Sequence, residues 1–180
     1  MDIELLKKIL MDNRRMISRI EFIKRDIILE DGLNYVFVGL RQAGKSFLMY
    51  QRIHQLLESG HSIDEIVYLN LDDERLFGMT VDDLDLILQA HYQLNDCTPV
   101  LFLDEIQNID HWEHFARRLA NEKYRVYITG SNAKMLSSEV ATTLGGRYMI
   151  QEVYPYSLVE YLRANGLSLS KNWMYDSETT

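Results

Sequence analysis

Four short apolar runs, none containing a charged residue, constrain the fold of this 180-residue chain more than any other feature. Strands of a parallel sheet are buried on both faces, so they read as continuous apolar runs. Segments with helical periodicity separate the runs, and this alternation predicts an α/β fold with a mainly parallel sheet. A shorter run at 148–150 predicts a weaker fifth strand. The four runs are Tyr35–Val38, Ile66–Leu69, Val100–Leu103 and Val126–Thr129.

Signals for helix ends lie between these runs. Thr80 is predicted to be an N-cap, and Asp110 and Ser157 each stand three residues before a glutamate, as the first residue of a capping box does. Gly60 and Gly166 stand where a glycine in the left-handed conformation ends a helix. The first 30 residues are predicted to be mostly helical, although their periodicity is ambiguous.

The segment between the first strand and the next helix matches the pattern G-x-x-x-x-G-K-[ST]. Its two glycines allow the backbone to curl so that successive N–H groups face phosphate oxygens, and the next helix adds its N-terminal dipole. Lys45 is long enough to reach the β- and γ-phosphates, and we expect it at the mouth of the loop, partly exposed. The Ser46 hydroxyl can ligate Mg²⁺. The predicted nucleotide-binding residues are Gly39, Leu40, Arg41, Gln42, Ala43, Gly44, Lys45, Ser46 and Phe47.

Two carboxylates end the third apolar run, 59 residues after Lys45. A carboxylate at the tip of a strand beside a phosphate loop can hold Mg²⁺ through its water shell, so Asp104 is predicted to be a metal partner with Ser46. Glu105 is predicted to orient and deprotonate the attacking water. A solvated Asp-Glu pair capping a strand is the alternative, and the phosphate loop at this spacing makes it the weaker one.

Composition excludes several classes of protein. The hydrophobic fraction is 47% and the charged fraction 26%, which argues against a mainly disordered chain. The net charge of −8 disfavours a general role in coating nucleic acid or anionic membranes. No apolar run is long enough to span a bilayer, and the single cysteine, Cys97, cannot form an intrachain disulfide. We therefore expect a cytoplasmic protein without a membrane partner.

Taken together, these motifs resemble those of the bacterial and archaeal AAA-like P-loop ATPases. That family has a phosphate loop of the form G-x-R-Q-x-G-K-[ST], which this chain repeats. The resemblance covers about residues 15–165. Its other motifs are Leu71–Arg75 (LDDER), Leu103–Gln107 (LDEIQ), Thr129–Asn132 (TGSN), Leu144–Arg147 (LGGR) and Tyr154–Ser157 (YPYS).

The resemblance implies a three-layer sandwich around about five strands, in which an inserted strand separates the metal-binding strand from the phosphate-loop strand. We expect a helical segment over residues 1–30, the ATPase domain over 31–165, and a disordered or truncated polar tail over 166–180. Family members usually continue into a further carboxy-terminal domain, which we expect this chain to lack.

Two further site residues follow from the resemblance. A polar residue after the fourth strand contacts the γ-phosphate or the lytic water in that family, and here it is Asn132, with Ser131 as the alternative. Arg147 follows two glycines and resembles an arginine finger, acting within the chain or across a homo-oligomer interface. The structural alternative for Asn132 is a polar turn after the strand, and for Arg147 it is a surface ion pair.

The function predicted from these residues is Mg²⁺-dependent binding and hydrolysis of ATP. We expect adenine and not guanine as the base, because of the resemblance and because the sequence has no Asn-Lys-x-Asp stretch of the kind that recognises guanine. The leading alternative is an ATP-dependent binding switch that hydrolyses little without a partner. A small-molecule kinase is a third reading, disfavoured because Glu105 next to Asp104 suits attack by water.

Two weaker patterns remain. His111 and His114 stand three residues apart and could begin a zinc site, but no third ligand is evident, so a solvated helix face is preferred. Residues 14–25 hold five basic side chains against one acidic one and leave contact with nucleic acid open, although a charged helix surface is the simpler reading.

Overall fold

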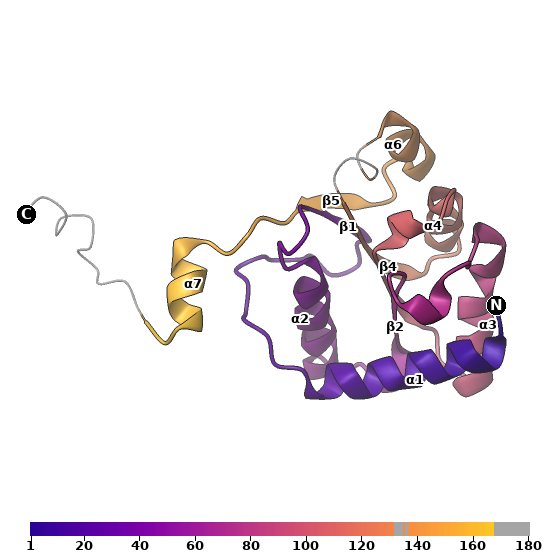
Figure 1. The fold of residues 1–180 in the computed structure, drawn as a ribbon, viewed down its shortest axis with the longest axis horizontal. Coiled ribbons are helices and arrows are strands. Elements are labelled where there is room, and N and C mark those ends of the chain that lie inside the picture. The colour runs from indigo at the N-terminus through magenta and orange to yellow at the C-terminus, as the bar shows by residue number, and fades with distance from the viewer. Residues whose placement is uncertain (132–134, 136, 168–180) are drawn as a thin grey trace, which may run out of the picture.

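The computed structural model describes residues 1–131, 135 and 137–167. Its centre is a five-stranded, entirely parallel sheet in the order β2-β3-β4-β1-β5 (Figure 1). All five predicted strands are present, and β4 lies between β1 and β3 as expected. The strands are β1 (Tyr35–Val38), β2 (Ile66–Asn70), β3 (Val100–Asp104), β4 (Arg125–Gly130) and β5 (Met149–Glu152). The α-helices described are α1 (Ile3–Arg19), α2 (Lys45–Glu58), α3 (Asp85–Leu94), α4 (Trp112–Asn121), α6 (Ser138–Leu144) and α7 (Leu158–Ala164).

The two faces of the sheet carry separate hydrophobic cores, because successive side chains of a strand point to opposite faces. In β1, Val36 and Val38 belong to the core under α3, α4 and α6. Tyr35 and Phe37 belong to the core that includes α2. Helices therefore cover both faces, and the predicted three-layer α/β sandwich is confirmed.

The N-terminal segment is helical only in its first part. Helix α1 begins at an Asp2 N-cap and ends at Arg19, and residues 20–34 form neither helix nor strand. Leu6 of α1 packs in the α3 core, whereas Ile17 packs in the α2 core. Helix α1 therefore runs past the edge of the sheet beside β2 and touches both layers.

Most of the predicted helix ends are confirmed. Gly60 follows α2 with φ +109°, and Ser157 forms the capping box of α7 through Glu160. Thr80 caps a 3-10 turn that precedes α3. The prediction for Asp110 is wrong. The N-cap of α4 is His111, in the left-handed conformation with φ +65°, and no side chain caps this helix.

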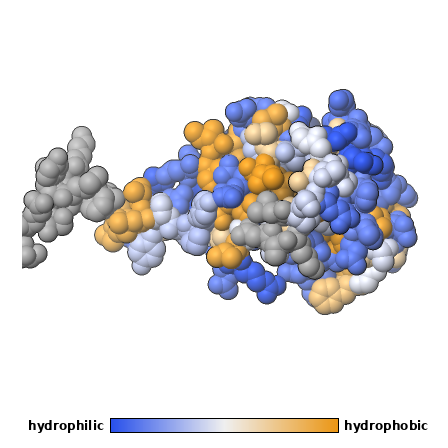
Figure 2. All heavy atoms as spheres, turned by 90° about the horizontal axis from the view of Figure 1, so that it is seen from above, coloured by the Kyte–Doolittle hydropathy of each residue, from blue (hydrophilic) through white to orange (hydrophobic). Residues whose placement is uncertain are grey.

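Helix α7 stands apart from the sheet, beyond the end of β5 (Figure 1). Exposed apolar side chains gather on β5 and α7, and Figure 2 shows orange spheres at this end of the molecule. They include Met149, Ile150, Leu158 and Val159, each about half exposed.

Candidate functional site

The phosphate loop links β1 to α2 at the carboxyl edge of the sheet. Gly44 has φ +90° and is the N-cap of α2, so this position requires the freedom of glycine. Gly39 is required for a different reason: a Cβ atom there would lie 2.3 Å from the carbonyl oxygen of Val153, just after β5. The first glycine therefore permits close backbone packing, a role separate from the predicted curl around phosphate. Gln42 also has a positive φ, of +63°.

Lys45 is buried and not partly exposed, which corrects the expectation from the sequence. Its Nζ donates hydrogen bonds to the carbonyl oxygens of Gly39 at 2.5 Å and Leu40 at 3.1 Å. The ammonium group is thus folded back onto its own loop. Its partners are neutral carbonyl groups, which an anionic phosphate can replace.

Asp104 ends β3, is fully buried, and is the acceptor at the centre of the site. Its Oδ2 accepts from the hydroxyls of Ser46 and Tyr68, each at 2.5 Å, and its Oδ1 accepts from the Thr129 hydroxyl. These donors come from α2, β2 and β4. The predicted metal pair, Ser46 and Asp104, is therefore in direct contact.

Tyr68 and Thr129 were not predicted as site residues. Burial, and next the charge of Asp104, raise the pKa of the Tyr68 hydroxyl, so it remains a proton donor at neutral pH. The signal that could have identified them is a hydroxyl among the last three residues of each strand that flanks the strand carrying the aspartate.

Glu105 follows in the left-handed conformation, with φ +56°. Its backbone N–H donates to the Thr129 hydroxyl at 2.9 Å, which fixes the turn. The side chain is half-buried, and its Oε2 accepts from Nε2 of Gln107 at 2.5 Å. A non-glycine residue in this conformation is uncommon and tends to mark a functional position.

A cavity of about 510 Å³ lies over the phosphate loop and brings most predicted nucleotide-binding residues together. Asp72 and Tyr156, which are not among the predicted nucleotide-binding residues, also line it. The Asp72 carboxylate lies 3.9 Å from the Arg41 guanidinium, whereas the neighbouring Asp73 caps a turn and pairs with Arg75. Of these two acidic residues after β2, Asp72 therefore lies at the cavity and Asp73 supports the local turn. The predicted residues on the cavity wall are Arg41, Gln42, Gly44, Lys45, Ser46, Phe47 and Glu105.

Arg25 is a further side chain that was not predicted as a site residue. It is buried, and its guanidinium donates to the carbonyl oxygen of Ala43 in the phosphate loop at 2.9 Å. The same group contacts Glu160 of α7 and lies 4.6 Å from the centre of the Tyr156 ring. Arg14, at the other end of the predicted basic segment, is also buried. These two arginines are therefore used within the fold.

Arg147 lies at the amino edge of the sheet, opposite the phosphate loop. It precedes β5, whose first residue Met149 pairs with Tyr35 at the start of β1. Its Nε donates to Oδ1 of Asn121, at the end of α4, at 2.7 Å. The length of β5, four residues or about 13 Å, separates Arg147 from the edge of the sheet that holds the phosphate loop. Of the two predicted finger geometries, contact within one chain is therefore wrong for this structure, and action across an interface stays a prediction.

The remaining sensor residue, Asn132, lies outside the described residues, so its role also stays a prediction. The site that the structure assembles thus consists of the phosphate loop, the Ser46–Asp104 pair and Glu105. Comparison with known proteins bears on what such a site binds.

The model of the family described as "AAA domain" matches residues 33–162. This chain belongs to the AAA domain family. Its phosphate loop and this membership make it a nucleotide-binding domain of the P-loop ATPase class, as the motifs predicted.

Two curated relatives are similar to this AAA domain over most of its length. An uncharacterized protein of Methanocaldococcus jannaschii, MJ1544, is 33% identical over 171 residues, which are 94% of this chain and 37% of that protein. An uncharacterized protein of Haemophilus influenzae is 32% identical over 158 residues, which are 86% of this chain and 40% of that protein. The chain thus spans about two fifths of the length of these relatives.

Among solved structures, AMPPCP-bound DnaA from Aquifex aeolicus is similar, with a TM-score of 0.49 and 16% identity, over 89% of this chain and 62% of that one. Within residues 1–131, 135 and 137–167, no helix combines the length and the apolar character needed to cross a membrane.

Proposed function

We propose that this AAA domain binds ATP together with Mg²⁺ in the cavity over the phosphate loop and hydrolyses the terminal phosphate. The observation that carries the proposal is the contact between Ser46 and Asp104. These residues lie 58 positions apart in the chain, yet their side-chain oxygens are 2.5 Å apart beside the lysine of the phosphate loop. A structural strand cap would not require a buried carboxylate at that place.

The residues present fit a magnesium ion. Mg²⁺ prefers oxygen ligands and retains several waters, so one hydroxyl and one carboxylate beside an open cavity suffice. Ser46 donates its proton to Asp104, so the lone pairs of its oxygen remain free for a cation. When bound, Mg²⁺ would neutralise charge on the β- and γ-phosphates.

Each predicted residue has a distinct role in this proposal. The loop N–H groups and the N-terminus of α2 bind phosphate oxygens, and Lys45 exchanges its two carbonyl acceptors for a phosphate. The Glu105 carboxylate first breaks its hydrogen bond with Gln107. It then accepts a proton from the attacking water. Asn132 orients that water, and Arg147 acts on the nucleotide of a neighbouring copy.

A binding switch with little turnover is the second candidate, and one observation favours it. The Glu105 carboxylate accepts a 2.5 Å hydrogen bond from Gln107, so in this conformation the proposed base already has a partner. A chain held in that state would bind ATP and hydrolyse it slowly. Helix α7, joined to the loop through Arg25, would then report nucleotide binding to whatever it contacts.

Two variants separate these functions. Lys45→Ala should weaken ATP binding at least about tenfold in calorimetry, because a charge-assisted contact is lost. Glu105→Gln should keep the affinity and lower phosphate release by about 10²-fold or more, because the amide cannot accept the proton. Exposed Lys8→Ala and Glu58→Gln are the matched controls and should change neither quantity.

Unchanged ATP affinity in Lys45→Ala would overturn the binding proposal. Tight ATP binding with equally slow phosphate release from the parent and Glu105→Gln would favour the switch over the enzyme.

A further inference from the structure

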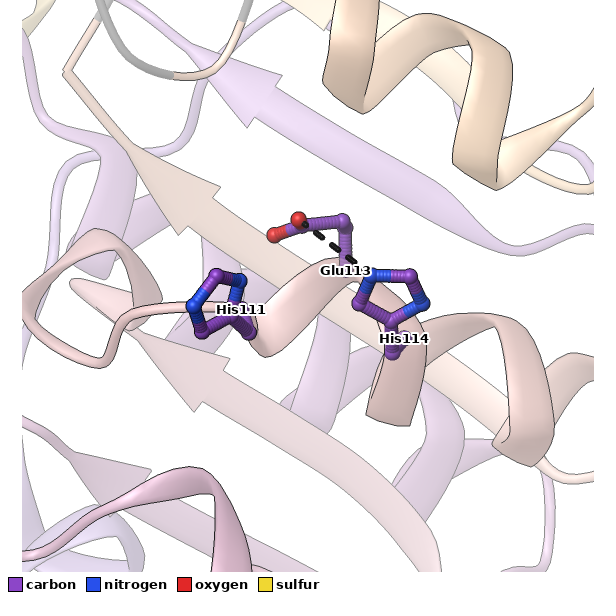
Figure 3. A group of neighbouring side chains, drawn as sticks. All are labelled: His111, Glu113 and His114. Atoms are coloured by element: carbon purple, nitrogen blue, oxygen red, sulfur yellow. Dashed lines mark ion pairs between the residues drawn. The ribbon is translucent and has the colours of Figure 1, made fainter.

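The structure supplies the third ligand that the histidine pair lacks in the sequence. His111, Glu113 and His114 lie where α4 begins, and their nearest nitrogen and oxygen atoms all lie within 4.8 Å of one another (Figure 3). The Glu113 carboxylate lies between the two imidazoles in that view. Two residues that stand two positions apart within a regular α-helix point to different sides. His111 and Glu113 can point to the same side because His111 is the left-handed N-cap and lies outside the helix.

Glu113 is a largely buried residue whose side chain reaches the wall of a cavity. Its side chain is 8% exposed, and among the described residues no hydrogen-bond donor reaches it. Its carboxylate Oε1 lies 3.9 Å from Nε2 of His114. The carboxylate faces this cavity with no donor among the described residues, so its oxygens are available to a cation.

The surroundings favour a cation. A separate cavity of about 390 Å³ opens onto the cluster, and its described wall includes Asp110, Glu113 and Glu139 but no lysine or arginine. The N-terminal dipole of α4 disfavours positive charge here, but it amounts to about half a charge, and three carboxylates outweigh it.

We propose that His111, Glu113 and His114 form a binding site for Zn²⁺, separate from the magnesium site at Asp104. Two imidazoles and one carboxylate are a known zinc ligand set, which leaves a fourth position for water. Bonds of about 2.0–2.2 Å place tetrahedral ligands about 3.4 Å apart, so ligand atoms that now lie up to 4.8 Å apart must approach by up to about 1.4 Å. Both imidazoles are exposed, so rotation of their side chains can bring the ligand atoms closer together.

Binding would fix the turn between β3 and α4. Gln107, which holds the carboxylate of Glu105, lies on the wall of the same cavity. The zinc site therefore adjoins the segment that positions the proposed catalytic base.

The test is calorimetric titration of the full chain with Zn²⁺, without nucleotide, since ATP itself binds zinc. The parent should bind one equivalent, and millimolar Mg²⁺ should not displace it, because Mg²⁺ prefers oxygen ligands. His114→Ala, Glu113→Gln and His111→Asn should each weaken binding at least about tenfold. Asparagine is chosen at 111 because it tolerates the left-handed conformation.

His61→Ala is the matched control, because exposed His61 pairs with half-buried Glu65, with Nδ1 and Oε2 3.3 Å apart. Among the described residues, no third ligand joins this pair. The control variant should leave zinc affinity unchanged. Co²⁺ bound to the parent should give the intense visible absorption of a four-coordinate ion, a result that needs no variant. No saturable binding, the weak absorption of a six-coordinate ion, or full affinity in Glu113→Gln would overturn the proposal.

Discussion

Arg25 and Glu160, 135 residues apart, form a buried ion pair in which Nε and Oε1 are 3.2 Å apart. The same guanidinium donates to Ala43 in the phosphate loop. Glu160 also accepts from the backbone N–H of Asp26 and closes the capping box of α7 with Ser157. One side chain therefore ties the segment before β1, the phosphate loop and α7 together.

Arg25→Met should destabilise the fold by about 3 kcal/mol, because the apolar stem is kept while Glu160 is left buried and unpaired. It should also weaken ATP binding, since the loop carbonyl of Ala43 loses its donor. Urea unfolding and calorimetry measure the two effects. The matched control is Arg163→Met, which removes an exposed ion pair with Asp26 between the same two segments. It should have little effect, and an equal loss in both variants would contradict the role of the buried pair.

The fold was predictable because each central strand is buried on both faces. A run such as Val100–Leu103 has no charged residue to mark a solvent face, and that pattern fits a parallel sheet. The capping box at Ser157 was predictable for a similar reason, since its hydrogen bonds join residues three apart. The prediction failed at Asp110, where the chain uses a left-handed His111 in place of a side-chain cap. Nothing in the sequence distinguishes these two solutions.

The site was predictable where the chemistry is local to a motif. Ser46 and Asp104 lie in such motifs, and both motifs lie at the carboxyl ends of strands. In a parallel sheet these ends share one edge, so the two motifs meet there. Tyr68 and Arg25 were missed because their importance comes from contacts made across the fold. The location of Arg147 follows from the start of β5 in register with β1, which no local pattern specifies.

Tyr68→Phe should weaken ATP binding in magnesium by several-fold and leave it nearly unchanged in EDTA. The lost hydroxyl holds the Asp104 carboxylate at 2.5 Å, and Asp104 acts through the metal in the proposed function. The control is Tyr148→Phe, since that hydroxyl is also buried and donates to the Ala116 carbonyl, away from the cavity. Both variants should lose about 1 kcal/mol of stability. An equal loss of affinity with and without magnesium would mean that Tyr68 acts on the fold alone.

Arg147→Ala and Glu105→Gln should each lack ATP turnover, and a mixture of the two should regain part of it. Arg147 lies at the sheet edge opposite the loop of its own chain, so the proposed finger would have to reach the nucleotide of another copy. A mixed interface pairs an intact Glu105 with an intact Arg147. Phosphate release from the mixture measures the rescue. Arg125→Ala, which removes a bond to Asn34 at the same edge, is the control and should keep full turnover. Activity of Arg147→Ala equal to that of the parent would exclude the finger.

The stability of the chain should fall between pH 7.5 and pH 5.5 through His91. This imidazole is fully buried; its Nε2 lies 2.6 Å from the Cys97 carbonyl and its Nδ1 lies 3.4 Å from Nη2 of Arg14. The neutral ring can donate to the carbonyl and accept from the guanidinium, whereas the charged ring has two donors. Burial, and to a smaller extent the charge of Arg14, lower the pKa of His91 below 6.5, although the Cys97 carbonyl and Asp64 act in the opposite direction.

Because the folded state binds fewer protons than the unfolded chain, stability is lost as the pH falls through 6.5 towards the folded pKa, by up to about 1.4 kcal/mol per pH unit. His91→Gln keeps a donor for the carbonyl and cannot titrate, so its free energy of unfolding should fall less over this range. Exposed His61→Gln should behave like the parent. The interval from pH 7.5 to pH 5.5 lies above the range in which carboxylates become protonated. Burial acts to raise the pKa of Glu160, but its hydrogen bonds lower that pKa overall, so Glu160 does not contribute to the loss of stability. Urea unfolding at the two pH values measures the difference, and an equal fall in the parent and in His91→Gln would rule out His91 as its source.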